Sequence, residues 1–211
     1  MALAIFKRMC PSCGGDITSD RLSEGLSCDR CSEREPNWIE EVGERVAELD
    51  EYFEKTIGTD MWSAQRLWAK RLFRNMSFAI TAPTGSGKTV FGILASLYLA
   101  ERGERVLFVL PTSILVGQVV EKASKFAREL GLGDLEIVCY HSLLSSREKK
   151  ESLEKMDRGE FDILVITSTF LTRHPELLDG VKFDFAFVDD VDGILRSSKA
   201  FESLLKCIGL D

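Results

Sequence analysis

The sequence is poor in side-chain amides, with two glutamines and two asparagines among its 211 residues. Charged side chains are abundant by comparison, since 29% of the residues are Asp, Glu, Lys or Arg. Few thermolabile amides and many charges are typical of proteins adapted to heat. The sequence therefore has a heat-adapted composition.

Long apolar runs are also missing. No stretch reaches the roughly 18 consecutive apolar residues that indicate a membrane-spanning helix. Residues 1–6 are briefly apolar, but Lys7, Arg8 and a cysteine motif follow them, which is the wrong order for a signal peptide. These absences predict a cytoplasmic protein that makes no membrane contact.

A strong basic charge is missing as well. The net charge is −7 and the pI is about 5.1, whereas nucleic-acid-binding proteins usually carry a basic patch. A local basic groove on an acidic body remains open. With 45% hydrophobic residues, the chain is long enough for one α/β core and a small appendage.

Four of the six cysteines form two C-x₂-C pairs near the N-terminus. Cys10 and Cys13 make the first pair, and Cys28 and Cys31 follow after 14 intervening residues. Each pair aims two thiolates at one point, and two pairs make a tetrahedral Zn²⁺ site. Segment 1–35 has few apolar residues, so metal binding would supply its folding energy. Two disulfides are the alternative, which a cytoplasmic setting disfavours.

Two helices are predicted between the cysteine segment and the next motif. Apolar residues recur at helical spacing from Pro36 and Asn37 onward, and Gly58 would end this first helix. We expect it to be a linker packed on the core. The second helix is predicted at 60–74.

A glycine-bearing loop, A-P-T-G-S-G-K-T at 82–89, lies between two apolar runs. The run 78–80 is predicted as a strand and the run 90–100 as a helix. Strand, loop, Gly-Lys-Thr and helix together match the phosphate-binding P-loop, except that Ala82 replaces its usual first glycine. An accidental glycine-rich turn is the alternative. The predicted ATP-binding residues here are Thr84, Gly85, Ser86, Gly87, Lys88 and Thr89.

Each loop residue type suits this chemistry for a physical reason. Gly85 and Gly87 let the backbone approach a polyphosphate closely, because a Cβ would block it. The following helix offers unpaired N–H groups and a partial positive charge. Lys88 would reach the β and γ phosphates, and the Thr89 hydroxyl would hold Mg²⁺.

Four further apolar runs are predicted as buried strands, at 105–110, 135–140, 161–167 and 183–188. The last delivers Asp189 and Asp190, and an apolar strand ending in two carboxylates is typical of a Walker B element. Asp189 would hold Mg²⁺, and Asp190 would orient and polarise the attacking water. Solvated turn residues are the alternative. Lys88, Asp189 and Asp190 are therefore the predicted catalytic residues.

Hydroxyl side chains follow two of the other predicted strands. Thr112 and Ser113 open a helix that runs to about 130, and Thr167, Ser168 and Thr169 end the strand at 161–167. Ligands bind at the carboxyl ends of strands in open α/β sheets. Contacts with nucleic-acid phosphates are one interpretation, and a simple helix cap is the alternative for Thr112 and Ser113.

Together these motifs resemble helicase superfamily 2. The segments 82–89, 111–118, 167–171 and 189–192 look like its motifs I, Ia, Ib and II. The cysteine motif, the run M-W-x-A-Q-R-x-W-A-K-R from Met61 and D-D-V-D in place of D-E-A-D resemble the reverse gyrase family specifically. In that family a helicase-like module is fused to a type IA topoisomerase, and ATP drives positive supercoiling of DNA in heat-loving organisms.

This resemblance implies the roles of several more residues. Gln65, 17 residues before Ala82, looks like the Q motif, in which one amide both donates to and accepts from the adenine edge. An exposed helix residue is the alternative. An upstream aromatic ring would stack on the base, and Phe53 and Trp62 are both candidates.

The resemblance also implies an α/β fold of RecA type in three segments: a four-cysteine zinc finger at 1–35, a linker helix at 36–58 and a first RecA-like helicase domain at 59–211. The expected cofactors are ATP, Mg²⁺ and Zn²⁺, and the expected partner is DNA. Whether the finger touches DNA or is a structural clip stays open, with DNA contact favoured.

Two departures from the family pattern affect the prediction. The sequence stops at Asp211 without an S-A-T motif, a second RecA-like domain or a topoisomerase tyrosine, so we expect these in the same longer polypeptide and slow hydrolysis by residues 1–211 alone. Asp190 replaces the usual Glu and is one methylene shorter. The alternatives are a DEAD-box-like or RecQ-like helicase with a zinc module, and a nucleotide-binding scaffold.

Overall fold

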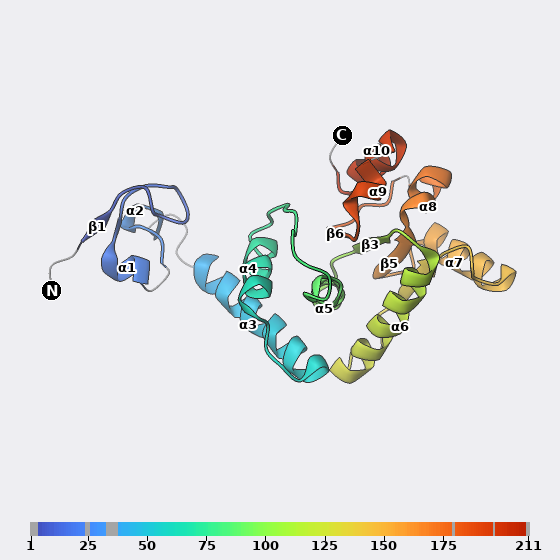
Figure 1. Cartoon of the computed structure of the whole chain (residues 1–211), viewed down its shortest axis with the longest axis horizontal. Helices are drawn as coiled ribbons and strands as arrows, with labels where there is room; N and C mark the ends of the chain where they lie inside the picture. Colours follow the sequence, from blue (N-terminus) through green and yellow to red (C-terminus); the bar gives the residue numbers. More distant parts are fainter. Residues whose placement is uncertain (1–3, 24–25, 33–37, 179, 196, 210–211) are drawn as a thin grey trace. The chain divides into compact units, whose positions relative to one another are not determined.

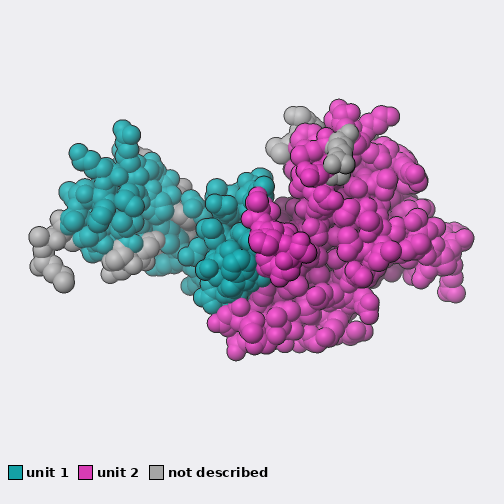
Figure 2. Space-filling view, in the orientation of Figure 1, with its two compact units in different colours: residues 1–51, 61–79 teal, residues 52–60, 80–211 magenta. Residues whose placement is uncertain are grey.

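A computed structural model of the chain describes residues 4–23, 26–32, 38–178, 180–195 and 197–209. It divides into two compact units, which Figure 2 colours teal and magenta. The first unit comprises 1–51 and 61–79, and the second comprises 52–60 and 80–211. Within the described ranges, no helix combines the length and the apolar character that crossing a membrane requires.

The first unit contains short elements at the cysteines and two longer helices. The predicted helix from 36 to 57 corresponds to α3, while Pro36 and Asn37 lie outside the described residues. The cysteine segment contains two short paired strands and two short helices, none of which the spacing of the cysteines predicts. The elements are β1 (Ile5–Phe6), antiparallel to β2 (Ile17–Thr18), then α1 (Ser19–Ser23), α2 (Asp29–Ser32), α3 (Trp38–Ile57) and α4 (Ser63–Leu72), and residues 52–57 of α3 are assigned to the second unit.

The second unit is built on a parallel sheet in the order β4-β5-β3-β6, of which Figure 1 labels β3, β5 and β6, and this sheet confirms the predicted parallel α/β class. The two central strands, β5 and β3, are buried along their whole length. The strands are β3 (Val106–Leu110), β4 (Ile137–Tyr140), β5 (Ile163–Thr167) and β6 (Phe185–Val188). The helices are α5 (Lys88–Glu101), α6 (Ser113–Leu130), α7 (Ser146–Arg158), α8 (Ser168–Arg173), α9 (Val191–Leu195), α10 (Ser198–Cys207) and the 3₁₀ turn η1 (Pro175–Leu178).

Successive strand residues face opposite sides of this sheet, and helices cover both sides. On one side, Leu107, Val109, Leu164 and Ile166 join a cluster with residues of α7, α8, α9 and α10. The helices α5 and α6 pack against each other and against the sheet. The chain therefore has the three-layer arrangement that places loops at the carboxyl ends of the strands.

The predicted strand at 78–80 is wrong, because the structure assigns no strand there. In the described part of the chain, β6 forms the edge of the sheet and pairs with β3 alone. Segment 78–80 therefore has no ladder of hydrogen bonds, and a ladder is what makes an extended segment a strand. The loop motif survives this change, since α5 begins at Lys88.

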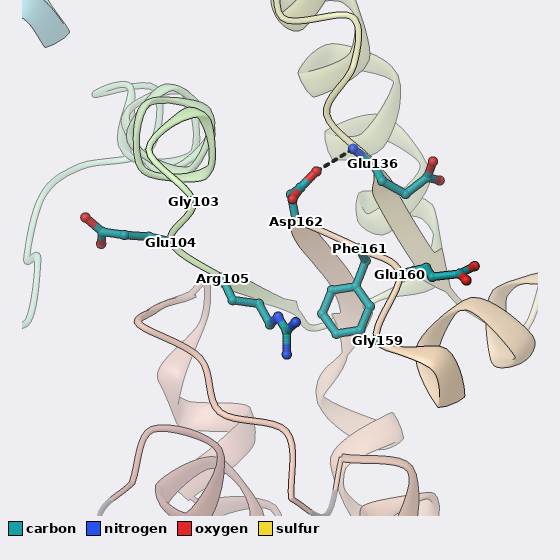
Figure 3. A pocket seen from close by; sticks show the side chains of 8 residues that line it. All are labelled: Gly103, Glu104, Arg105, Glu136, Gly159, Glu160, Phe161 and Asp162. Atoms are coloured by element: carbon teal, nitrogen blue, oxygen red, sulfur yellow. Dashed lines mark hydrogen bonds between the residues drawn. The ribbon is translucent and has the colours of Figure 1, made fainter.

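At the amino-terminal ends of the strands, two aspartates each form the same pair of hydrogen bonds with the main chain of a neighbouring strand. The Asp162 carboxylate accepts the N–H of Glu136 at 2.8 Å, and the Asp162 N–H donates to the Glu136 carbonyl at 2.9 Å; Figure 3 shows the first of these bonds. Asp184 and Arg105 are joined in the same way, at 2.8 and 2.9 Å. Each aspartate thus extends the pairing of two strands beyond their last main-chain partners.

Gly92 on α5 lies where the helix meets β6. A Cβ built on Gly92 would lie 2.8 Å from three carbons of the Phe187 ring, which itself packs on Phe108 with ring centroids 4.7 Å apart. Gly92→Ala is therefore expected to destabilise the chain by about 1–2 kcal/mol, because overpacking outweighs the gain in helix propensity. Denaturant unfolding monitored by circular dichroism measures this change.

Gly117 on α6 is the matched control. A Cβ there meets no atom within 4 Å, so Gly117→Ala is expected to stabilise the chain by up to about 1 kcal/mol through helix propensity alone. If both substitutions shift the unfolding midpoint in the same direction, the close contact between Gly92 and Phe187 is not a constraint on the fold.

Candidate functional site

The loop before α5 has the backbone that close phosphate contact requires. Gly85 and Gly87 both have a φ of +81°, a left-handed conformation that favours glycine. The hydroxyl of Ser86 is buried and has no hydrogen-bond partner among the described residues. Lys88 donates from Nζ to the carbonyls of Ala82 at 2.7 Å and Pro83 at 3.0 Å. The loop thus contains a cation, an unpaired hydroxyl and a helix N-terminus together.

The P-loop helix meets the end of β6 through one hydrogen bond. The Thr89 hydroxyl donates to Oδ2 of Asp189 at 3.0 Å, across 100 residues of sequence. Asp189 is positioned by its own N–H, which donates to the Val109 carbonyl of β3 at 2.9 Å. A hydroxyl and a carboxylate at this distance are hard oxygen donors that can share a Mg²⁺ ion.

Asp190 adopts an unusual backbone conformation. Its φ is +61°, in the left-handed region, and its side chain is exposed. This conformation costs about 1 kcal/mol for a residue other than glycine, and Asp and Asn tolerate it best. The strain lies directly after the carboxylate that contacts Thr89. Such strain is common at functional sites.

Gln65 and the two aromatic candidates have different environments. Gln65 is buried, and its Oε1 accepts the N–H of Trp62 at 3.2 Å, so its side chain caps the start of α4. Phe53 is 2% exposed and packs on Phe91, so it has no free ring face for a base. Trp62 is 47% exposed, with an edge contact to Trp68. Base stacking by Trp62 and adenine recognition by Gln65 stay predictions.

Thr112 has the capping role that the sequence leaves open. Its hydroxyl accepts the N–H of Leu115 at 3.3 Å and so caps α6. Ser113 instead pairs with the hydroxyl of Ser142, at 2.9 Å. The sequence analysis missed Ser142, although it lies two residues after β4, close to where Ser168 follows β5. That shared position after a strand was the available signal.

The hydroxyl residues at the end of β5 divide by exposure. Thr167 is buried, and its hydroxyl accepts a hydrogen bond from that of Thr169 at 3.2 Å. Thr169 is exposed and Ser168 is half-buried, so these two are the accessible residues of the group. The predicted nucleic-acid contacts at β5 therefore depend on them.

The four N-terminal cysteines converge on one point. The sulfurs of Cys10, Cys13, Cys28 and Cys31 all lie within 4.8 Å of one another, and Cys13 and Cys28 are 3.8 Å apart. Zn–S bonds of about 2.3 Å in a tetrahedron put sulfurs about 3.8 Å apart. The donor set therefore fits Zn²⁺.

Two thiols of the cluster have opposite pKa shifts. Burial raises the pKa of the Cys10 thiol, but N–H groups from Cys28, Cys13 and Ser12 outweigh burial and lower it to about 6. The neighbouring Cys13 thiol raises the pKa of Cys31 to about 12. Without a cation, the first thiolate disfavours deprotonation of the neighbouring thiols. A bound divalent ion would offset this repulsion between thiolates.

A hollow of about 380 Å³ lies at the opposite, amino-terminal edge of the sheet (Figure 3). In it the Arg105 guanidinium lies 5.4 Å from the centre of the Phe161 ring. None of the predicted site residues lines this hollow. The predicted chemistry belongs to the carboxyl ends of the strands instead, where Thr89 meets Asp189.

Comparison with known proteins gives two family matches. Residues 62–209 match the DEAD/DEAH box helicases, and residues 1–47 match the reverse gyrase zinc finger. The chain is 44% identical to the reverse gyrase of Pyrobaculum aerophilum, in an alignment that covers 99% of this chain and 19% of that protein. Reverse gyrase 1 of Aeropyrum pernix is 38% identical (98% and 17% covered), and the Methanocaldococcus jannaschii reverse gyrase is 41% identical (98% and 14%).

These matches confirm the resemblance that the motifs predict, and they indicate an ATP-dependent enzyme. The chain spans 14–19% of the length of these three relatives.

Proposed function

This chain belongs to the DEAD/DEAH box helicase family. From its similarity to reverse gyrases, we propose that it is the ATP-binding part of a DNA topoisomerase of reverse-gyrase type, which introduces positive supercoils. In this proposal the zinc finger, the linker helix and the first RecA-like domain act with a second RecA-like domain and a type IA topoisomerase domain of one cytoplasmic polypeptide. The heat-adapted composition agrees with the proposal.

One observation carries the nucleotide part of the proposal, namely the hydrogen bond between Thr89 and Asp189. It joins the residue after the P-loop lysine to the first carboxylate after β6. A glycine-rich turn and an acidic turn with unrelated roles would have no reason to meet across 100 residues of sequence. Their meeting supports one shared site for a nucleotide and a metal ion.

The residues of the chain divide the work at this site. Lys88 and the N–H groups at the start of α5 bind and orient the β and γ phosphates of ATP. Thr89 and Asp189 hold Mg²⁺, which when bound neutralises charge on the phosphates. Asp190 accepts a hydrogen bond from the attacking water and orients it. In this proposal an arginine from the second RecA-like domain stabilises the transition state of phosphoryl transfer, so residues 1–211 are expected to hydrolyse ATP slowly by themselves.

Asp189→Asn tests this division of labour. The substitution keeps the shape of the side chain but removes its negative charge, so binding of a fluorescent ATP analogue is expected to weaken roughly 10- to 100-fold in Mg²⁺ and to change little in EDTA. Fluorescence titration under both conditions measures the difference. Asp134→Asn, in an exposed loop of the same unit, is the matched control. Equal weakening with and without Mg²⁺ would remove Asp189 from the metal site.

A helicase with a zinc module is the second candidate function, because the DEAD/DEAH box match covers most of the chain. A plasmid assay on the intact polypeptide that contains this chain separates the two. ATP-dependent positive supercoiling supports the topoisomerase, and strand separation without a change in linking number supports the helicase. A nucleotide-binding scaffold would do neither.

A further inference from the structure

The hollow at the amino-terminal ends of the strands contains a guanidinium group without an acceptor. Arg105 is half-buried, and its guanidinium lies 5.4 Å from the centre of the buried Phe161 ring. A Cβ built on Gly159 would lie 3.9 Å from Nη2 of Arg105, so the group also lies beside the turn between α7 and β5. Among the described residues, the guanidinium has no carboxylate or carbonyl partner. Its N–H groups are therefore available to a group that enters the hollow.

Two carboxylates that line the hollow have other cationic neighbours. Glu136 pairs with Lys155 at 2.8 Å, and the Glu160 carboxylate lies 3.9 Å from the guanidinium of Arg158. Figure 3 shows both glutamate side chains pointing away from the Arg105 guanidinium. These pairs offset part of the negative charge around the hollow, and they leave Arg105 without a partner of its own.

Building on the proposed function, we propose that this hollow binds a carboxylate side chain from another domain of the same polypeptide. Arg105 donates two parallel hydrogen bonds to that carboxylate, because the fork of a guanidinium matches a carboxylate in both shape and charge. Its half-buried position strengthens the pair, since the effective dielectric constant there is lower than in water. The hollow holds about 380 Å³, which is enough for one side chain and its neighbouring main chain.

Charge and position favour an acidic side chain over a nucleotide or DNA phosphate. Glu104 and Asp162 also line the hollow, and their negative potential opposes a polyanion more than a single carboxylate. The hollow lies at the opposite ends of the strands from Thr89 and Asp189, so its occupant leaves the ATP site open. The chain spans 14–19% of the length of the three reverse gyrases, so in the proposed polypeptide most of the sequence is available to supply the carboxylate.

Amide hydrogen exchange, measured by mass spectrometry on the intact polypeptide, tests this docking. Peptides that span 102–106 and 157–163 are expected to exchange about 10- to 100-fold more slowly than in residues 1–211 alone, since a charge-assisted hydrogen bond holds the docked domain over them. Arg105→Gln in the intact polypeptide is expected to restore the faster exchange. Arg105→Lys is expected to keep part of the protection, because lysine offers the charge without the fork. Thermal melting checks that both variants stay folded.

Arg147→Gln is the matched control, because Arg147 is exposed on α7 and lies outside the hollow. If the wild-type peptides exchange equally fast in the intact polypeptide and in residues 1–211, no domain covers the hollow and the proposal is overturned. Protection that survives Arg105→Gln also overturns it, because docking then does not use the guanidinium. The plasmid assay on the same intact wild-type polypeptide tests the proposed function separately: supercoiling without protection contradicts the docking alone, and absence of supercoiling contradicts the proposed function.

Discussion

Lys88→Ala is expected to weaken ATP binding roughly 30- to 700-fold and to leave the chain folded. The figure follows from the loss of a partly buried ammonium–phosphate contact, which costs about 2–4 kcal/mol in comparable charge pairs. In the absence of nucleotide, Lys88 holds the carbonyls of Ala82 and Pro83. Its removal therefore costs the fold two ordinary hydrogen bonds at most, about 1 kcal/mol each.

A lysine outside the loop serves as the control for this substitution. Lys125 lies on α6, is 62% exposed and pairs with Glu129 at 3.7 Å, so Lys125→Ala should bind ATP like the wild type. Calorimetric titration with ATP and Mg²⁺ measures affinity, and circular dichroism confirms that both variants fold. If Lys88→Ala keeps wild-type affinity, the loop at 82–89 does not bind the triphosphate.

Removal of zinc is expected to unfold segment 1–35 completely. The apolar cluster there consists of Cys10, Ile17 and Cys28, with Leu22 and Cys31 packed against it, so three of its five members are themselves metal ligands. Binding of structural Zn²⁺ supplies about 10–16 kcal/mol in small fingers, and this cluster has little else to hold it together.

A chelator series with metal analysis tests this expectation. Amide signals of 4–32 in an NMR spectrum should collapse to random-coil positions as zinc leaves, and Cys10→Ser should give the same spectrum without a chelator. Cys139→Ser is the control, because Cys139 lies on β4 and outside the cluster. A finger that keeps its native spectrum after all zinc is gone would show that the four cysteines do not hold the fold by metal ligation.

The sequence was informative where a physical requirement leaves few residue choices. Left-handed turns demand Gly85 and Gly87, and buried parallel strands demand continuous apolar runs, so the loop and four of the five predicted strands could be identified in advance. The C-x₂-C spacing likewise predicted that four sulfurs converge on one point, and they do.

The sequence was insufficient where the structure of a residue or segment depends on contacts with distant parts of the chain. Segment 78–80 has a strand-like composition, but an extended segment becomes a strand only beside a neighbour, and local composition does not reveal the neighbour. Phe53 and Trp62 are equally plausible stacking residues by type, and only burial separates them. The bond between Ser113 and Ser142 joins two strand ends that are 29 residues apart, a distance that no local pattern spans.

Asp162 and Asp184, at the amino-terminal ends of their strands, affect where the sheet can open. Asp162 and Asp184 each close an extra ring of hydrogen bonds beyond the last rung of their strands, so fraying cannot begin easily from that end. The opposite end has glycine turns and a strained Asp190, and no aspartate among the described residues closes such a ring there. Local opening of the sheet should therefore start at the carboxyl ends of the strands, where Thr89 contacts Asp189, while the amino-terminal ends stay paired.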